Sequence, residues 1–175
     1  MKLTLSERFR SLSQEPYNVA REIGISEGQT VADIGAGKGF LTIPASAIVG
    51  RKGLVYSVEP DSERSRRITE RVVNEGLENV RVLTTGAEQL GEIPSDSVDL
   101  AFSVFSIHHF KDKRAGLMEI RRILRNGGAF YVWDRIPGII MRHGTRSAEL
   151  DQLSGVFTKF ELLSAKRTIR ARFTK

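Results

Sequence analysis

Residues 31–39 read Val-Ala-Asp-Ile-Gly-Ala-Gly-Lys-Gly, a short apolar run with one acid followed by alternating glycines. The apolar residues on either side of Asp33 suit a strand that is buried on both faces. The alternating glycines, Gly35, Gly37 and Gly39, allow a sharp turn and a close approach of the backbone to a ligand. The acid stands at the carboxyl end of the strand, where open α/β sheets bind their ligands. Because a carboxylate repels a phosphate, the stretch favours a ligand that carries positive charge.

The glycine spacing excludes two common nucleotide motifs. The dinucleotide fingerprint G-x-G-x-x-G needs its third glycine at position 40, which is Phe40. The phosphate loop G-x-x-x-x-G-K-[ST] is also absent, because Lys38 is followed by Gly39. A plain structural corner between a strand and a helix is the alternative interpretation of these nine residues.

The composition is that of an ordinary globular chain. Its 175 residues, of which 40% are apolar and 27% charged, predict a single domain with a sizeable core. The absence of cysteine excludes disulfides, thiolate metal sites and cysteine nucleophiles, and we expect no metal site. No apolar run approaches the roughly 18 residues of a membrane span, and the first residues lack the apolar core of a signal peptide. We therefore expect a cytoplasmic protein.

The net charge of +6 is concentrated at one end of the chain. Residues 135–175 carry nine lysines and arginines against three acids, whereas residues 1–134 carry eighteen of each sign. Such an asymmetry can mark a face that binds anions or nucleic acid, and a solvated surface is the alternative. We divide the expected domain into a helical segment (1–28), a ligand-binding core (29–134) and a basic segment (135–175).

Strand and helix patterns alternate along the chain. Strands are expected at 30–34, 54–58, 80–83, 98–104 and 129–133, with a β-hairpin within 158–174. Helices are expected at 6–12, 17–23, 43–48 and 147–153, from Asp61 to Gly76, and from Asp112 to a stop at residues 126–128. This alternation predicts an α/β fold, a Rossmann-like doubly wound sheet that is mostly parallel, has helices on both faces and ends in antiparallel strands. Right-handed crossovers would gather the parallel strand ends on one edge.

Two further groups of residues at that edge of the sheet favour a nucleoside ligand. Glu59 ends the second strand, where an acid can accept hydrogen bonds from both ribose hydroxyls, although an acid that starts a helix is the alternative. Residues 85–88 follow the third strand and read Thr-Gly-Ala-Glu. There the N–H of Ala87 could contact an adenine edge, and Glu88 could accept from its amine or remain a solvated loop acid.

Taken together with these sites, residues 18–135 resemble the class I S-adenosylmethionine-dependent methyltransferases, in particular the ubiquinone/menaquinone-biosynthesis-like group. Residues 31–39 are similar to the family's first motif, 55–59 to its second-strand motif, 96–110 to its fourth-strand motif, and 117–128 to the helix and Gly-Gly turn before strand five. The resemblance implies S-adenosylmethionine as cofactor. It implies cofactor contacts from Asp33, Gly35, Ala36, Gly37, Gly39, Glu59, Pro60, Gly86, Ala87, Glu88 and Ser103.

Three departures from the family pattern bear on which cofactor contacts and which methyl acceptors are expected. Gly86 stands where many relatives carry Asp, which weakens adenine recognition at that point. Residues 103–105 read Ser-Val-Phe instead of the Asn/Asp-Pro-Pro-aromatic sequence that resembles amino-methylating enzymes, which argues against an amide or adenine nitrogen. The absence of cysteine argues against an arsenic methyltransferase.

On the acceptor side, His108 and His109 are candidate bases, with loop packing as the alternative. Phe105, Phe110 and Trp133 suit a core or a pocket wall. The segment 135–146 combines apolar residues with Arg135, Arg142 and Arg146, and we expect a mobile flap whose arginines bind a small, anionic or amphipathic acceptor. RNA is the alternative acceptor. A nicotinamide oxidoreductase and a cofactor-binding subunit without activity are the alternatives to a methyltransferase.

Overall fold

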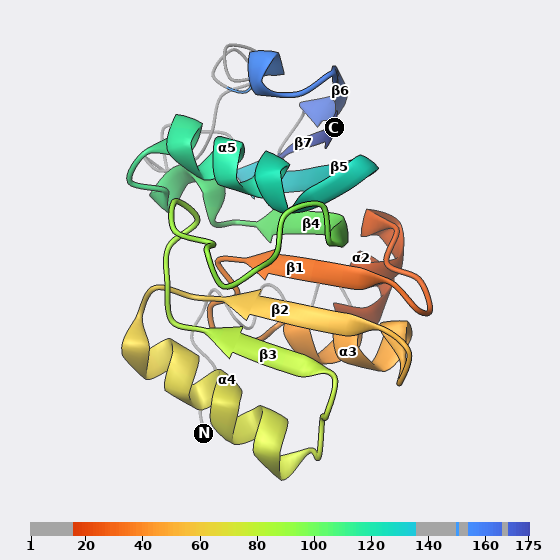
Figure 1. Ribbon diagram of the computed structural model, residues 1–175, viewed down its shortest axis with the longest axis vertical. Coiled ribbons are helices and arrows are strands. Elements are labelled where there is room, and N and C mark those ends of the chain that lie inside the picture. Colours follow the sequence, from red (N-terminus) through yellow and green to blue (C-terminus); the bar gives the residue numbers. More distant parts are fainter. Residues whose placement is uncertain (1–15, 136–149, 151–153, 166–167) are drawn as a thin grey trace.

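The computed structural model describes residues 16–135, 150, 154–165 and 168–175, whose strands form one seven-stranded sheet (Figure 1). The strand order is β3-β2-β1-β4-β5-β7-β6. The strand bounds are β1 Thr30–Ile34, β2 Leu54–Val58, β3 Val80–Leu83, β4 Val98–Val104, β5 Leu124–Arg135, β6 Lys159–Ala165 and β7 Thr168–Thr174.

Strands β1 to β5 run parallel, and β7 runs antiparallel between β5 and β6. In the middle of the sheet, Val31 pairs with Val55 of β2 on one side and with Leu100 of β4 on the other. The carboxyl ends of these strands therefore meet on one edge, at the left of Figure 1. The predicted Rossmann-like α/β class, with antiparallel strands at the carboxyl end, is confirmed.

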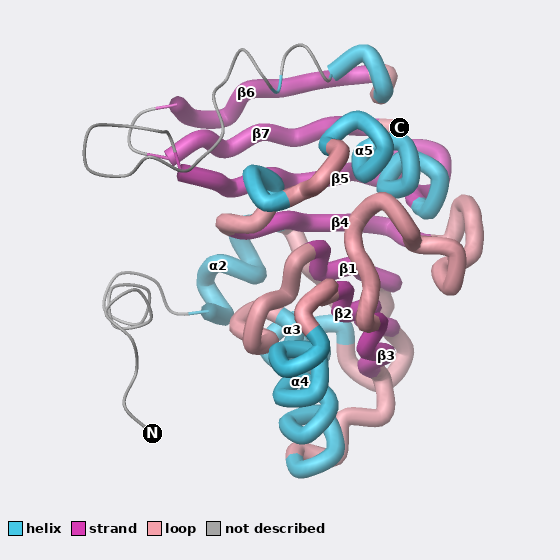
Figure 2. The backbone as a smooth tube through the Cα atoms, turned by 90° about the vertical axis from the view of Figure 1, so that its left-hand side faces the viewer, coloured by secondary structure: helices cyan, strands magenta, loops and turns pink. Residues whose placement is uncertain are grey.

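Helices cover both faces of this sheet. Their bounds are α2 Pro16–Ile23, α3 Thr42–Val49, α4 Ser62–Asn74 and α5 Lys113–Ile123, with short 3-10 turns η1 Ile107–His109 and η2 Ser154–Val156. Figure 2, which views the carboxyl edge, shows α2 and α3 on one side and α5 on the other. Each face has its own apolar cluster, and α4 lies along β3 (Figure 1). None of the helices within the described ranges is long and apolar enough to cross a membrane.

Local chemistry explains where the helices begin. Pro44 is the third residue of α3, so its missing N–H falls in the first turn, where it costs no intrahelical hydrogen bond. Asp61 caps α4 by accepting from the N–H of Arg64 at 2.9 Å, and Asp112 caps α5 by accepting from Ala115 at 2.9 Å. These helix starts confirm the predictions.

The end of α5 differs from the prediction. We expected the helix to continue to residues 126–128, but it ends at Ile123 and β5 begins at Leu124. Leu124 pairs with Val98, and the carbonyl of Ile123 accepts from the N–H of Ser97. Gly127 adopts φ +77° and its N–H donates to the carbonyl of Lys175, just beyond β7, while the N–H of Lys175 donates to the carbonyl of Gly128. Pairing with neighbouring strands therefore replaces the last helical turn that the apolar periodicity indicated.

Several predicted elements lie outside the described residues. These are the helices at 6–12 and 147–153, the latter apart from Leu150, and most of the expected flap, including Arg142 and Arg146. The predicted hairpin is confirmed by β6 and β7.

Candidate active site

The glycine turn between β1 and α3 is anchored to the end of β2. The N–H groups of Gly35 and Ala36 both donate to the carbonyl of Val58, at 2.8 and 3.0 Å. Gly35, Gly37 and Gly39 all have positive φ, between +62° and +78°, which only glycine adopts readily. A Cβ placed on Gly37 would meet nothing within 4 Å. The turn is thus rigidly attached on one side, and its Gly37 backbone faces open space.

Asp33 lies beneath this turn and is only 3% exposed. The Thr42 hydroxyl donates to its Oδ2 at 2.8 Å and lies 2.9 Å from the Ser57 hydroxyl. The pKa of Asp33 is raised to about 7: burial is the largest cause, the Thr42 hydrogen bond opposes the rise, and the negative charge of Glu59 adds to it. A cation placed near this carboxyl would stabilise its ionised form.

Glu59 joins the end of β2 to the glycine turn. Its carboxylate, 3% exposed, accepts from the N–H of Gly37 at 2.8 Å and from that of Asp61 at 3.1 Å. The Arg64 guanidinium lies 4.0 Å away. The intervening Pro60 is exposed. Two buried carboxylates, of Asp33 and Glu59, thus stand at the ends of neighbouring parallel strands.

The loop after β3 packs against the start of α5. Glu88 Oε1 accepts from the N–H of Asp112 at 3.1 Å, and a Cβ on Gly86 would lie 2.6 Å from Glu88 Oε2. Ala87 is 5% exposed and lies against Gly116 of α5. Glu88 therefore has a structural partner, and its predicted contact with an adenine amine stays a prediction.

The loop between β4 and η1 is docked on the glycine turn. The Ser106 hydroxyl donates to the carbonyl of Ile34 at 2.7 Å and lies 2.6 Å from the buried Ser103 hydroxyl. A Cβ on Gly35 would lie 2.5 Å from the Cβ of Ser106. Phe105 has φ +56°, a left-handed conformation that is rare for a bulky residue. Ser103 thus reaches the glycine turn through Ser106.

This loop also brings His108 to the end of β5. The Nδ1 atom of His108 lies 2.8 and 2.9 Å from the two carboxylate oxygens of Asp134. Asp134 is fully buried, and the His108 side chain is 9% exposed. The ring of His109 is exposed and stands 4.0 Å from the His108 ring, centroid to centroid.

Arginines and aromatic rings alternate along the neighbouring strand ends. The Arg135 guanidinium lies 5.2 Å from the Phe105 ring, and that of Arg170 lies 3.8 Å over the Trp133 ring. Arg170 also pairs with Glu22 of α2. Trp133 is 1% exposed and belongs to the core, as predicted, and Phe110 packs against the other apolar cluster. Part of the basic carboxyl-terminal charge is therefore used inside the fold.

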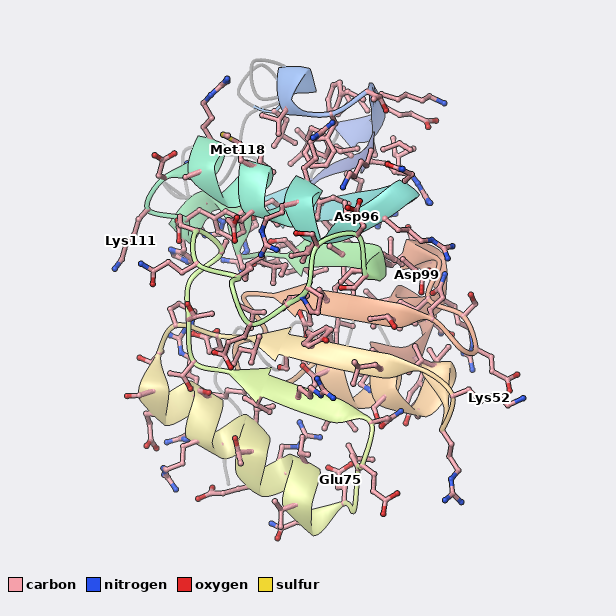
Figure 3. The ribbon with its side chains drawn as sticks, in the orientation of Figure 1. Lys52, Glu75, Asp96, Asp99, Lys111 and Met118 are labelled. Atoms are coloured by element: carbon pink, nitrogen blue, oxygen red, sulfur yellow. The ribbon has the colours of Figure 1, made fainter. Side chains whose placement is uncertain are left out.

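The strand ends that carry the candidate residues meet on one edge, and Arg142 and Arg146 lie outside the described residues. Figure 3 marks the direction of this edge, with Lys111 near it and Lys52 and Asp99 at the opposite one. Sequence reasoning missed Thr42, Ser57, Ser106 and Asp134. A hydroxyl at the first position of the helix after the glycine turn was the available signal for Thr42. Within the described part of the chain, no group of three acids or histidines could hold a metal ion.

Residues 32–132 match the family described as the methyltransferase domain. The chain belongs to this family. A crystal structure of an S-adenosylmethionine-dependent methyltransferase from Aquifex aeolicus has the same fold, with a TM-score of 0.78, 24% identity and 99% of each chain covered. This methyltransferase domain and that enzyme therefore share the Rossmann-like fold.

Two curated relatives of this methyltransferase domain are both named C-methyltransferases, one of quinone biosynthesis and one of sterols. It is 30% identical over 110 residues to a ubiquinone/menaquinone biosynthesis C-methyltransferase of Marinomonas sp., covering 62% of this chain and 43% of that protein. It is 27% identical over 131 residues to a sterol 24-C-methyltransferase of Aspergillus fumigatus, covering 72% and 33%. The chain spans less than half the length of these relatives.

Proposed function

We propose that this chain is an S-adenosylmethionine-dependent methyltransferase of small organic acceptors. The observation that carries the proposal is the pair of buried carboxylates, Asp33 and Glu59, at the ends of adjacent parallel strands around a glycine turn. A carboxylate pair suits a cationic nucleoside better than a dinucleotide phosphate, and family membership points to the same cofactor.

The residues present fit this cofactor. Gly37 offers backbone that no Cβ obstructs, and Glu59 is placed to accept from ribose hydroxyls while it holds the Gly37 N–H. Asp33 and the carbonyl groups of the turn would attract the positive end of the cofactor, and Gly86 and Ala87 would contact its adenine. When bound, the cofactor supplies an activated methyl group, so the protein has mainly to align it with the acceptor.

The small-molecule acceptor is supported by the quinone-pathway and sterol enzymes among the relatives. Arg135, together with Arg142 and Arg146, is proposed to favour an anionic or amphipathic acceptor. The RNA alternative receives no support from these relatives, and Arg170 and Lys175 of the basic segment form ion pairs with Glu22 and Asp96.

The test of the cofactor site is Glu59→Gln. The variant keeps an oxygen for the Gly37 N–H but loses the charge that would bind the ribose, so we expect about 10- to 100-fold weaker binding of S-adenosylmethionine and S-adenosylhomocysteine. Isothermal titration calorimetry measures both ligands and NAD. Glu92→Gln, which changes an exposed acid in the same way, is the matched control and should bind like the wild type.

Binding of NAD without S-adenosylmethionine would contradict the proposal. The acceptor is then tested with methyl-tritiated S-adenosylmethionine, presented separately with a small-molecule metabolite extract and with total RNA. We expect label in the extract. Label in RNA alone would contradict a small acceptor, and cofactor binding with label in neither would favour a subunit without activity of its own.

A further inference from the structure

A histidine and a buried acid meet at the carboxyl edge, outside the residues that would hold the cofactor. His108 comes from η1 and Asp134 from the end of β5, and the two side chains are joined at the Nδ1 atom of the ring. Asp134 Oδ1 also accepts from the N–H of Arg135 at 2.8 Å, which fixes the carboxylate. The pair is therefore built by two separate segments that the fold brings together.

The position of the carboxylate selects the state of the ring. An acid that accepts from Nδ1–H keeps the proton of a neutral imidazole on that nitrogen, which leaves Nε2 as the acceptor. The same carboxylate stabilises the positive charge that appears on the ring when Nε2 takes a proton. Because Asp134 is fully buried, water does not screen this interaction.

The loop that carries His108 is tied to the candidate cofactor turn. Ser106, two residues before His108, donates to Ile34 at the end of β1 and fills the space that a side chain at position 35 would take. Its carbonyl accepts from the N–H of His109 at 2.9 Å. The imidazole is thus attached to the turn that would hold the cofactor, and not only to β5.

We propose that His108 is the general base that removes a proton from the methyl acceptor, and that Asp134 is the positioning residue that orients it. The inference rests on the proposed function and adds to it a chemical class of acceptor. Such an acceptor carries an O–H or an acidic C–H, because a group that is already an anion needs no base.

The methyl transfer moves one proton and one electron pair of the acceptor. Nε2 of His108 takes the proton of the acceptor X–H, where X is oxygen or carbon, and the electron pair freed on X forms the new bond to the methyl carbon. The bond from that carbon to sulfur breaks with its electron pair staying on sulfur, which gives S-adenosylhomocysteine. His108 is left as an imidazolium paired with the Asp134 carboxylate, and it returns its proton to solvent after the product leaves.

The charged and titratable neighbours of the ring are few among the described residues. Asp134 contacts it from β5, the His109 ring lies beside it within η1 at a tilt of 44°, and Arg135 follows Asp134 on β5 with its guanidinium over Phe105. A purely structural pair would also hold η1 against β5. The test therefore needs a readout that a structural role would not change.

The test compares His108→Asn, Asp134→Asn and the wild type as full chains. Initial rates of tritiated methyl transfer to the metabolite extract are measured from pH 5 to pH 9, and binding of S-adenosylhomocysteine is measured by calorimetry. We expect His108→Asn to lose about 10²- to 10⁴-fold in rate with unchanged S-adenosylhomocysteine affinity. The pH profile of the wild type should change in both variants. The maximal rate of Asp134→Asn should also be lower, because a neutral amide no longer stabilises the positive charge on the ring.

Asp96→Asn is the matched control, because it changes an exposed acid that precedes β4 and pairs with Lys175. Asn tolerates the positive φ of this position, so the wild-type rate and pH profile are expected. His108→Ala with added imidazole distinguishes loss of the base from misfolding. Partial recovery of the rate would show that the variant is folded and lacks only the imidazole. Unchanged cofactor binding with an unchanged rate in His108→Asn would overturn this inference alone. Absence of S-adenosylmethionine binding by the wild type would overturn the proposed function with it.

Discussion

A single buried carboxyl, that of Asp33, makes the ligand-free protein sensitive to pH. Its pKa is about 7 in the fold and 3.8 in its ordinary state, so between these values the folded chain holds a proton that the unfolded chain has released. Its contribution to stability is therefore complete below about pH 4 and is lost as the pH rises through 7.

Sequence patterns placed Asp33 correctly at the end of β1. They could not show Thr42 and Ser57 beside it, because that contact depends on how α3 packs on β2.

Asp33→Asn should remove this pH dependence. The amide keeps an oxygen for the Thr42 hydroxyl but cannot ionise. The free energy of unfolding of the variant minus that of the wild type should increase by on the order of 4 kcal/mol from pH 4 to pH 8. The wild type loses stability over this range, and one pKa unit corresponds to about 1.4 kcal/mol. Urea denaturation of the ligand-free proteins across this range measures the difference. Parallel profiles for the two proteins would contradict a raised pKa.

At the scale of elements, the sequence identified β1 to β4 with their observed bounds, because each is a short apolar run between clear turn signals. It misplaced the junction of α5 and β5 because Leu124 fits a helical stripe and a buried strand equally well, and only pairing with Val98 decides between them. His108 was a candidate from its position after β4. Asp134 was not, because its partnership depends on a loop docked through Ser106.

That docking can be tested with two glycines of the same turn. Gly37→Ala should cost about 1–2 kcal/mol of stability, the strain of a left-handed backbone, because a Cβ there meets nothing. Gly35→Ala should cost clearly more, since its Cβ would collide with Ser106 and displace the hydrogen bond to Ile34. Thermal and urea unfolding measure both. Adding Ser106→Gly to Gly35→Ala should recover the part due to the collision, and equal costs for the two single variants would contradict this account.

For the whole molecule, the carboxyl-terminal hairpin forms part of the main sheet and core. Phe173 of β7 is fully buried and lies 5.9 Å from the ring of Phe130 of β5 and 5.0 Å from that of Phe160 of β6. We expect Phe173→Ala to lower the free energy of unfolding by about 3–5 kcal/mol, measured by urea denaturation. Leu163→Ala on β6, where the side chain is 45% exposed, should cost less than about 1 kcal/mol. A similar small loss for both variants would place the hairpin outside the cooperative core.

The position of β7 also sets an order of assembly. It follows β6 in the chain but lies between β5 and β6, so β6 cannot join the sheet before β7 has paired with β5. Until then the unpaired backbone groups of β5 form an open sheet edge next to His108 and Asp134, and such an edge can pair with a strand of another chain. In the finished fold β7 covers this edge of β5, and β6 becomes the outermost strand on that side of the sheet.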